Sequence, residues 1–156
     1  MKSLVAIIVV SFSLAGCDSS EMPEPAKPVI KDDSIKRNLN PEQLARGANL
    51  FLNNCASCHG AEAQGTLNWQ KKGVDGKFLP PPLNGTGHTW HHPKTALKYT
   101  IKNGTRRIGG NMPGFSDKLN DVQIEDVLTF LQEKWPVPLY EGWYRTDKRA
   151  RNAQVN

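Results

Sequence analysis

The chain has 156 residues, a hydrophobic content of 38% and a formal net charge of +5, which leaves room for one modest domain without internal repeats. No stretch approaches the roughly 20 consecutive apolar residues that cross a bilayer, so the sequence predicts no transmembrane helix. The positive charge favours acidic binding partners.

Residues 1–16 are predicted to be an export signal. A lysine near the start precedes a short apolar run that ends in small residues, which is typical of secretory signal peptides. Leu14-Ala15-Gly16-Cys17 resembles the lipobox of bacterial lipoproteins, in which the cysteine is diacylated on sulfur and becomes the N-terminus. The alternative is an ordinary signal peptide that leaves Cys17 as a free thiol. We therefore expect lipidation at Cys17, on the periplasmic side of the bacterial inner membrane, and export excludes a nucleic acid partner.

Residues 17–40 are predicted to be a lipid-anchored linker. They mix charges with Pro23, Pro25 and Pro28 and show no apolar period, which is the composition of a semi-extended segment. Residues 41–136 would form the domain, and residues 137–156 a basic C-terminal extension.

The first helix of the domain is predicted to begin at residue 41. Asn40 is a suitable cap, Pro41 suits the first helical position and Gln43 the third. Gly47 lies inside this helix, where glycine costs about 1 kcal/mol relative to alanine. One interpretation is that another backbone crosses the helix closely at this point. The alternative is a chance loop-forming residue with no such contact. The apolar face of the helix consists of Leu44, Ala48, Phe51 and Cys55.

Two further helices are expected, and no strand-like alternation is present. One helix runs from near Pro93 to Asn103-Gly104, and the other follows a capping pattern at Asn120 and Gln123 and stops before Pro136. The fold class is therefore predicted to be all-α. Three short helices with long loops bury little apolar surface, so we expect the loops to wrap around a large apolar cofactor.

The stretch Cys55-Ala56-Ser57-Cys58-His59 has the spacing that attaches c-type haem. On a helical turn its two thiols and the imidazole share one face, so the thiols can add to the vinyl groups at one haem edge above His59. A thioredoxin-like pair would need a βαβ context, which is missing. A zinc site would need further ligands, and only His88, His91 and His92 could supply them. One motif predicts one covalent haem c.

Met112 is the only methionine of the predicted domain and is expected to be the sixth iron ligand. Pro113 favours extended backbone at Met112, and Met/His ligation of haem raises the potential. Gly109, Gly110 and Gly114 would let the loop approach a flat surface. The alternative is a methionine that only fills the core.

The sequence resembles the class I monohaem cytochrome c family over about residues 41–136. Gly47 and Phe51 before "CASCH", Pro81 and Leu83 in "PPPLNG", "NMP" at Met112, and Val127 and Phe130 carry the resemblance. It implies the family fold, with Gly47 where the first and last helices cross. It also implies that the Pro81 carbonyl accepts a hydrogen bond from the second ring nitrogen of His59.

Two stretches depart from the family pattern, namely "GHTWHHP" and the basic "YRTDKRARNAQ" near the C-terminus. His88, His91 and His92 are interpreted as loop residues or helix caps, with a second metal site, such as copper, as the alternative. Arg106 and Arg107 could pair with haem propionates or face water. Trp69 and Trp90 could donate to a propionate, although filling the haem pocket is the simpler role.

With both axial positions filled by protein, no site remains for a small-molecule substrate, so we expect an electron carrier and not an enzyme. The redox partners would have an acidic docking surface, to which Lys71, Lys72 and Lys77 are suited; the basic tail could instead touch anionic lipid. The alternatives are the haem subunit of a larger oxidoreductase complex, and a haem or metal sensor or metal-binding module.

Overall fold

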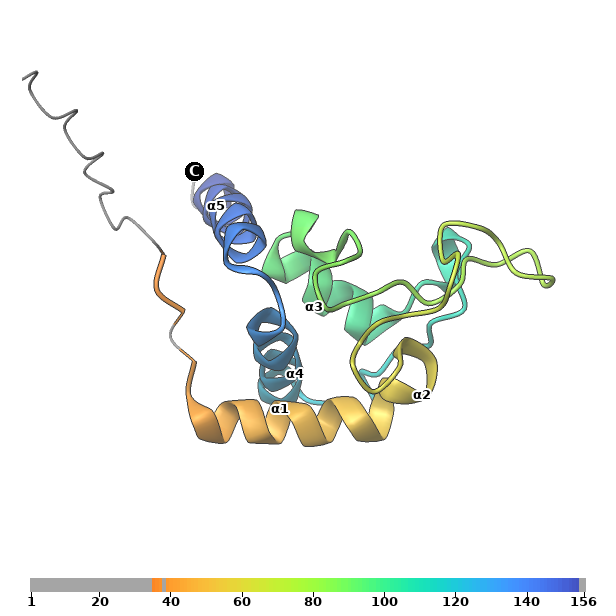
Figure 1. Ribbon diagram of the computed structural model, residues 1–156, viewed down its shortest axis with the longest axis horizontal. Helices are drawn as coiled ribbons and strands as arrows, with labels where there is room; N and C mark the ends of the chain where they lie inside the picture. Colours follow the sequence, from red (N-terminus) through yellow and green to blue (C-terminus); the bar gives the residue numbers. More distant parts are fainter. Residues whose placement is uncertain (1–34, 38, 155–156) are drawn as a thin grey trace, which may run out of the picture. The chain divides into compact units, whose positions relative to one another are not determined.

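The computed structural model describes residues 35–37 and 39–154, so the predicted signal peptide, Cys17 and most of the expected linker lie outside it. Within this part there are five α-helices, two 3₁₀ turns and no strand (Figure 1). The predicted all-α fold class is confirmed. None of these helices combines the length and the apolar character that crossing a membrane requires. The elements are α1 (Pro41–Asn54), α2 (Ala56–His59), η1 (Thr89–His91), α3 (Lys94–Asn103), η2 (Arg106–Ile108), α4 (Asp121–Glu133) and α5 (Val137–Ala153).

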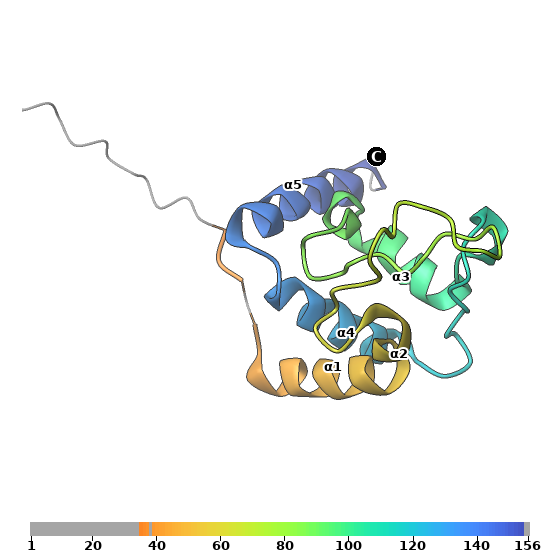
Figure 2. The same cartoon turned by 45° about the vertical axis from the view of Figure 1, so that its right-hand side comes forward.

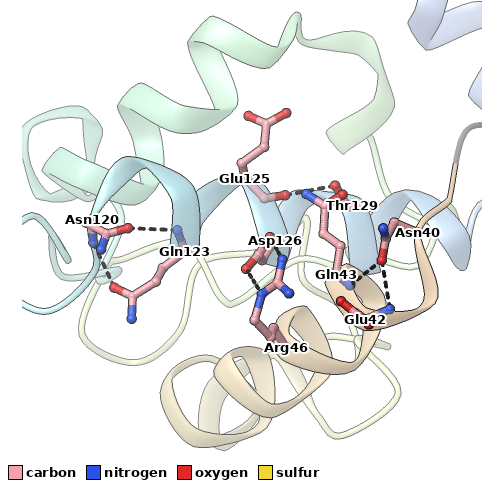
Figure 3. A network of polar contacts seen from close by, with 9 residues as sticks. All are labelled: Asn40, Glu42, Gln43, Arg46, Asn120, Gln123, Glu125, Asp126 and Thr129. Atoms are coloured by element: carbon pink, nitrogen blue, oxygen red, sulfur yellow. Dashed lines mark hydrogen bonds and ion pairs between the residues drawn. The ribbon is translucent and has the colours of Figure 1, made fainter.

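Both predicted capping motifs are present. Asn40 Oδ1 accepts hydrogen bonds from the backbone N–H groups of Glu42 and Gln43, at 2.9 and 3.1 Å, and Pro41 occupies the first turn of α1. Asn120 and Gln123 form a reciprocal capping box at the start of α4, with donor–acceptor distances of 2.9 and 3.0 Å (Figure 3). The local sequence therefore determines where both helices begin.

Helices α1 and α4 cross at Gly47. A Cβ atom on Gly47 would lie 2.1 Å from the carbonyl oxygen of Asp126 and 2.9 Å from Cβ of Phe130. Phe51 is fully buried beside this point, with its ring 5.4 Å from that of Phe130. Only glycine allows so close an approach, as the cytochrome c resemblance implied. Arg46 and Asp126 form an ion pair at 2.8 Å across the crossing (Figure 3).

Residues 137–153, expected only as a basic extension, form the longest helix of the described chain, α5. Its inner face carries Tyr140, Trp143 and Asp147, all at most 9% exposed. Trp143 packs edge-on against Trp135, with ring centroids 5.9 Å apart. The extension therefore completes one of the two apolar clusters, together with Leu97 and other residues of α3 and α4.

Helix α3 receives its N-terminal cap from α5. The backbone N–H of Lys94 donates to Asp147 Oδ1 at 2.8 Å, whereas Pro93, the residue before the helix, provides no side-chain acceptor. A free N–H at a helix start is thus satisfied by an aspartate 53 residues further along the chain.

The end of the expected linker contacts the helical unit. The guanidinium of Arg37 donates to the carbonyl groups of Gln132, Glu133 and Trp135, at 3.0, 3.0 and 2.5 Å. It also lies 4.6 Å from the centre of the Tyr140 ring. Arg37 therefore satisfies free carbonyls at the end of α4 and touches the first turns of α5.

Candidate functional site

Cys55, Cys58 and His59 lie at the junction of α1 and α2. Cys55 follows the last residue of α1, and its carbonyl accepts the backbone N–H groups of Cys58 and His59 at 3.1 and 2.9 Å. This single helical turn brings positions i, i+3 and i+4 to one side. Both cysteines are free, Cys58 is exposed, and the His59 side chain is buried at 7% exposure.

The His59 ring is oriented by Pro81. Its Nδ1 atom lies 2.9 Å from the Pro81 carbonyl oxygen, which can only accept, so Nδ1 carries the proton and Nε2 keeps a free lone pair. Burial lowers the pKa of His59, and the bond to Pro81 opposes this effect. A neutral imidazole with an oriented Nε2 is the form that ligates a metal.

Cys55 has the properties of an unactivated thiol. Burial, followed by the neighbouring Cys58, raises its pKa to about 11. Redox-active cysteines of the thioredoxin type have pKa values below that of free cysteine. The raised pKa of Cys55 therefore adds to the absence of a βαβ context among the described residues, and both disfavour a thioredoxin-like motif.

Met112 is held in a loop packed against the end of α3. Its backbone N–H donates to Thr105 Oγ1 at 3.1 Å, and the Thr105 N–H donates to the Met112 carbonyl at 3.0 Å. The loop lies on the same side of the unit as α2 in both views (Figures 1 and 2). The half-buried Met112 side chain also packs against the cluster that contains Leu97 and Phe115.

The glycines around Met112 also make close contacts within the chain, and their expected approach to a flat group stays a prediction. A Cβ atom on Gly110 would lie 2.2 Å from Thr105 Oγ1, and one on Gly114 would lie 2.5 Å from the Lys102 carbonyl oxygen. These glycines permit close packing of the loop on its own chain. Gly109 has a left-handed backbone, with φ of 89°, which is the reason for glycine there.

The three histidines of the "GHTWHHP" stretch are exposed, and two of them stack on tryptophans. His88 stacks on Trp69 and His91 on Trp90, with ring centroids 5.1 and 3.7 Å apart. Burial lowers the pKa of His92, and the charges of His88 and His91 lower it further. Among residues 35–37 and 39–154, no group of three or more His, Cys, Asp or Glu side chains could hold a metal ion. The structure thus gives no support to a zinc or second metal site.

Trp90, Arg106 and Arg107 are the other residues considered for propionate binding. Trp90 Nε1 donates to the Gly87 carbonyl at 3.1 Å, so its N–H is already used within the chain. Arg106 and Arg107 are exposed in η2.

The donor set fits a haem c group. It comprises two thiols at the junction of α1 and α2, the oriented Nε2 atom of His59 and the thioether of Met112. The long loops also carry exposed apolar side chains, with Leu67, Ile108 and Phe78 at 86%, 77% and 48% exposure in the polypeptide alone. Such side chains suit contact with a large apolar group. Bound haem c supplies a one-electron couple, while the chain supplies ligands, orientation and apolar cover.

Helical architecture, a glycine helix crossing and the Cys-x-x-Cys-His turn together define a c-type cytochrome domain. The chain belongs to the cytochrome c family described as "Cytochrome C oxidase, cbb3-type, subunit III", whose model matches residues 42–131. The expected class I monohaem cytochrome c resemblance is confirmed. The domain carries one covalent haem c and transfers electrons.

The curated relatives differ in size and name. The chain is 35% identical over 89 residues to a cbb3-type cytochrome c oxidase subunit CcoP from Azospirillum sp. (strain B510), covering 57% of this chain and 28% of that protein. It is 28% identical over 95 residues to cytochrome c6 of Diacronema lutheri, covering 58% and 95%. It is 34% identical over 101 residues to a thiosulfate dehydrogenase of Allochromatium vinosum, covering 61% and 32%. The matched region thus spans under a third of the oxidase subunit's length, and no solved structure matches the chain.

Proposed function

We propose that the protein is a lipid-anchored monohaem cytochrome that passes single electrons between periplasmic or membrane-bound redox proteins. Cys55 and Cys58 attach the haem, and His59 and Met112 are the axial ligands of its iron. The observation that carries this proposal is the His59–Pro81 hydrogen bond beside the two thiols, because it leaves Nε2 oriented for an iron ion.

The test of ligation is Met112→Ala in the haem-loaded protein. Because thioether sulfur is soft and favours ferrous iron, we expect loss of the sulfur-to-iron charge-transfer band and a lower reduction potential. The haem should stay attached through the cysteines. An unchanged spectrum and potential would contradict Met112 ligation, and His88, His91 and His92 variants would then identify a histidine ligand.

Covalent attachment is tested by acid–acetone extraction. We expect the haem to remain with the polypeptide in the native protein, and Cys58→Ala to attach haem poorly. Free haem in the extract of the native protein would refute the thioether assignment.

The lipid anchor rests on the sequence at Cys17. Mass spectrometry of the native protein should find acyl chains on Cys17, and Cys17→Ser should yield an unlipidated haem protein. An unmodified Cys17 in the native protein would exclude the anchor. Asp18 resembles an inner-membrane retention signal, so recovery from outer-membrane fractions would contradict that location alone.

A second candidate function is that of an electron-transfer subunit in a larger oxidoreductase complex. The names of the relatives favour it, since several are subunits of cbb3-type oxidases and one is a cytochrome c subunit of a cytochrome bc1 complex. Co-purification of a catalytic chain from gently solubilised membranes would support this role. A carrier would instead be recovered alone.

The exposed Lys71 and Lys72 support an acidic docking surface on the partner. They lie in the loop whose Phe78 N–H donates to the Gly109 carbonyl at 3.2 Å, three residues before Met112. Docking there would bring a partner close to the proposed axial ligand, and salt should weaken it.

A further inference from the structure

Helix α5 has two faces of different chemistry. Tyr140, Trp143 and Asp147 point into the unit and are buried. At 100° per residue the opposite face is made of positions 141, 145, 148, 149 and 152, spaced as i, i+4, i+7, i+8 and i+11. That outward face is exposed from Arg145 onward.

The exposed half of α5 is strongly basic. Arg145, Lys148 and Arg149 lie on the outward face, and Arg151, one turn after Asp147 on the inward side, has 57% of its side chain exposed. The acids of the helix do not balance them: Asp147 is buried at 4% exposure and already binds Lys94 N–H and Arg151, and Glu141 pairs with Arg145 at 3.4 Å. Lys148 and Arg149 have no carboxylate partner among the described residues.

The N-terminal segment joins the unit beside this helix. Arg37 lies over the ring of Tyr140 on α5. Lys36 lines a cleft of about 560 Å³ together with Tyr144 and Arg151. Lys36 is exposed and adds a further positive charge near the helix. The chain therefore enters the unit at the helix that carries the basic face.

The chain length places this face within reach of a lipid surface. Seventeen residues lie between the proposed anchor Cys17 and Ile35, and the eighteen steps from one to the other span at most about 65 Å in an extended chain. A bound anchor makes any second contact of the same molecule with the bilayer intramolecular, which raises its effective concentration. This step rests on the proposed lipid anchor.

We infer that the basic face of α5, formed by Arg145, Lys148 and Arg149, binds the anionic headgroups of the membrane. Basic side chains close to an anionic lipid surface are attracted to it, and each strengthens binding by about fivefold. Helices α5 and α2 are well separated in both views (Figures 1 and 2). Contact through α5 therefore turns the Cys55–His59 turn away from the lipid, where redox partners can reach it.

The test uses the full-length haem-loaded Cys17→Ser protein, which has no lipid of its own. Its affinity is measured by co-sedimentation with vesicles of phosphatidylcholine and phosphatidylglycerol in equal parts, and with vesicles of phosphatidylcholine alone. We expect binding to the anionic vesicles only, and its loss at about 1 M salt, where charges are screened beyond about 3 Å. Equal binding to the anionic and the phosphatidylcholine vesicles would overturn the inference.

A matched pair of variants separates this face from net charge. Arg145→Gln/Lys148→Gln/Arg149→Gln should weaken vesicle binding by about 100-fold, since three contributions of about fivefold multiply. Lys71→Gln/Lys72→Gln/Lys77→Gln removes the same charge from the loop after the haem motif and should weaken binding far less. Equal losses in the two variants would show a net-charge effect and refute the assignment to α5. Haem absorbance and circular dichroism establish that both variants are folded.

Two outcomes separate this inference from the proposed anchor. If native Cys17 proves unmodified, the anchor fails, yet vesicle binding by the Cys17→Ser protein would still support the basic face. If Cys17 is lipidated but the α5 variant and its parent bind vesicles equally, the inference fails and the anchor stands. The α5 variant could instead fail to bind an acidic protein partner while it binds vesicles as well as its parent does. That result would assign the basic face of α5 to the protein partner and refute the lipid role.

Discussion

The contact of α1 with α4 and the contact of α5 with α3 both bury an aspartate, but they use it differently. At the first, Asp126 is 2% exposed and pairs with the Arg46 side chain across a glycine crossing. At the second, Asp147 is 4% exposed and accepts the backbone N–H that begins α3. The first contact depends on the close approach of two backbones, with the charge pair at its edge. The second depends on a polar bond in its centre.

This difference predicts the largest effect at Gly47. Gly47→Ala would place Cβ 2.1 Å from the Asp126 carbonyl oxygen, and overpacking of this kind costs about 3 kcal/mol even against the better helix propensity of alanine. Gly142→Ala in α5 is the matched control, because its Cβ would meet only Trp90 at 3.6 Å. That change should be neutral or stabilise by up to about 1 kcal/mol. Urea unfolding of the haem-loaded proteins measures both, and equal stability would disprove the close crossing.

The second largest effect is expected at Asp147. Asp147→Ala removes the cap of α3 and the partner of Arg151, so we expect a loss of about 2 kcal/mol. Asp147→Asn keeps an acceptor for the Lys94 N–H and should lose about half as much. If both variants were equally unstable, the negative charge of Asp147, and not its hydrogen bond to the Lys94 N–H, would stabilise the contact of α5 with α3. The loss is measured from the urea midpoints of the variants, provided that the free energy of unfolding falls with urea concentration at the same slope in each.

A smaller effect is expected where the N-terminal segment meets α4 and α5. Arg37→Ala leaves the carbonyls of Gln132, Glu133 and Trp135 to water, and we expect a loss of about 1 kcal/mol. Hydrogen exchange should speed up at the end of α4 and the start of α5, and remain unchanged in α1. Faster exchange throughout the unit would show that Arg37 supports the whole fold.

The smallest effect is expected at the Arg46–Asp126 pair. The Arg46 side chain is 56% exposed, so water and salt reach its guanidinium. Asp126 has a side-chain exposure of only 3%, so the substitution used is glutamine, whose amide can still donate to the carboxylate. Arg46→Gln should lower the urea midpoint slightly at low salt and not at high salt. A double-mutant cycle with Asp126→Asn isolates the pair. A coupling that persists at high salt would mean that the pair is shielded from solvent.

The sequence predicted the parts of this fold that depend on neighbouring residues. The start of α1 at Asn40, the capping box at Asn120 and the Cys55–His59 turn are local patterns, and the structure contains each of them. Gly47 and Pro81 were assigned through the family resemblance, and their contacts agree with it. The iron-ligand roles of His59 and Met112 remain predictions.

The parts that could not be predicted depend on contacts between distant residues. Helix α5 was missed because its buried face includes the charged Asp147, whose partner is a backbone N–H 53 residues away. The contacts of Gly110 with Thr105 and of Gly114 with Lys102 were not predicted, because the sequence does not show how this loop folds onto the end of α3. A one-dimensional pattern does not show which surface a glycine meets, or that an aspartate has a buried partner.

The α1–α4 crossing also determines the order in which the unit can be completed during synthesis. Arg46 and Asp126 are 80 residues apart, and at about 5–20 residues per second a ribosome needs about 4–16 s to make that interval. Throughout it, α1 has left the ribosome without the helix that covers Phe51. The two thiols of the Cys55–His59 turn follow α1 directly, so they are presented on a nascent chain well before the core can close. The crossing therefore forms only after α4 has been made, whereas the Cys55–His59 turn depends on neighbouring residues alone.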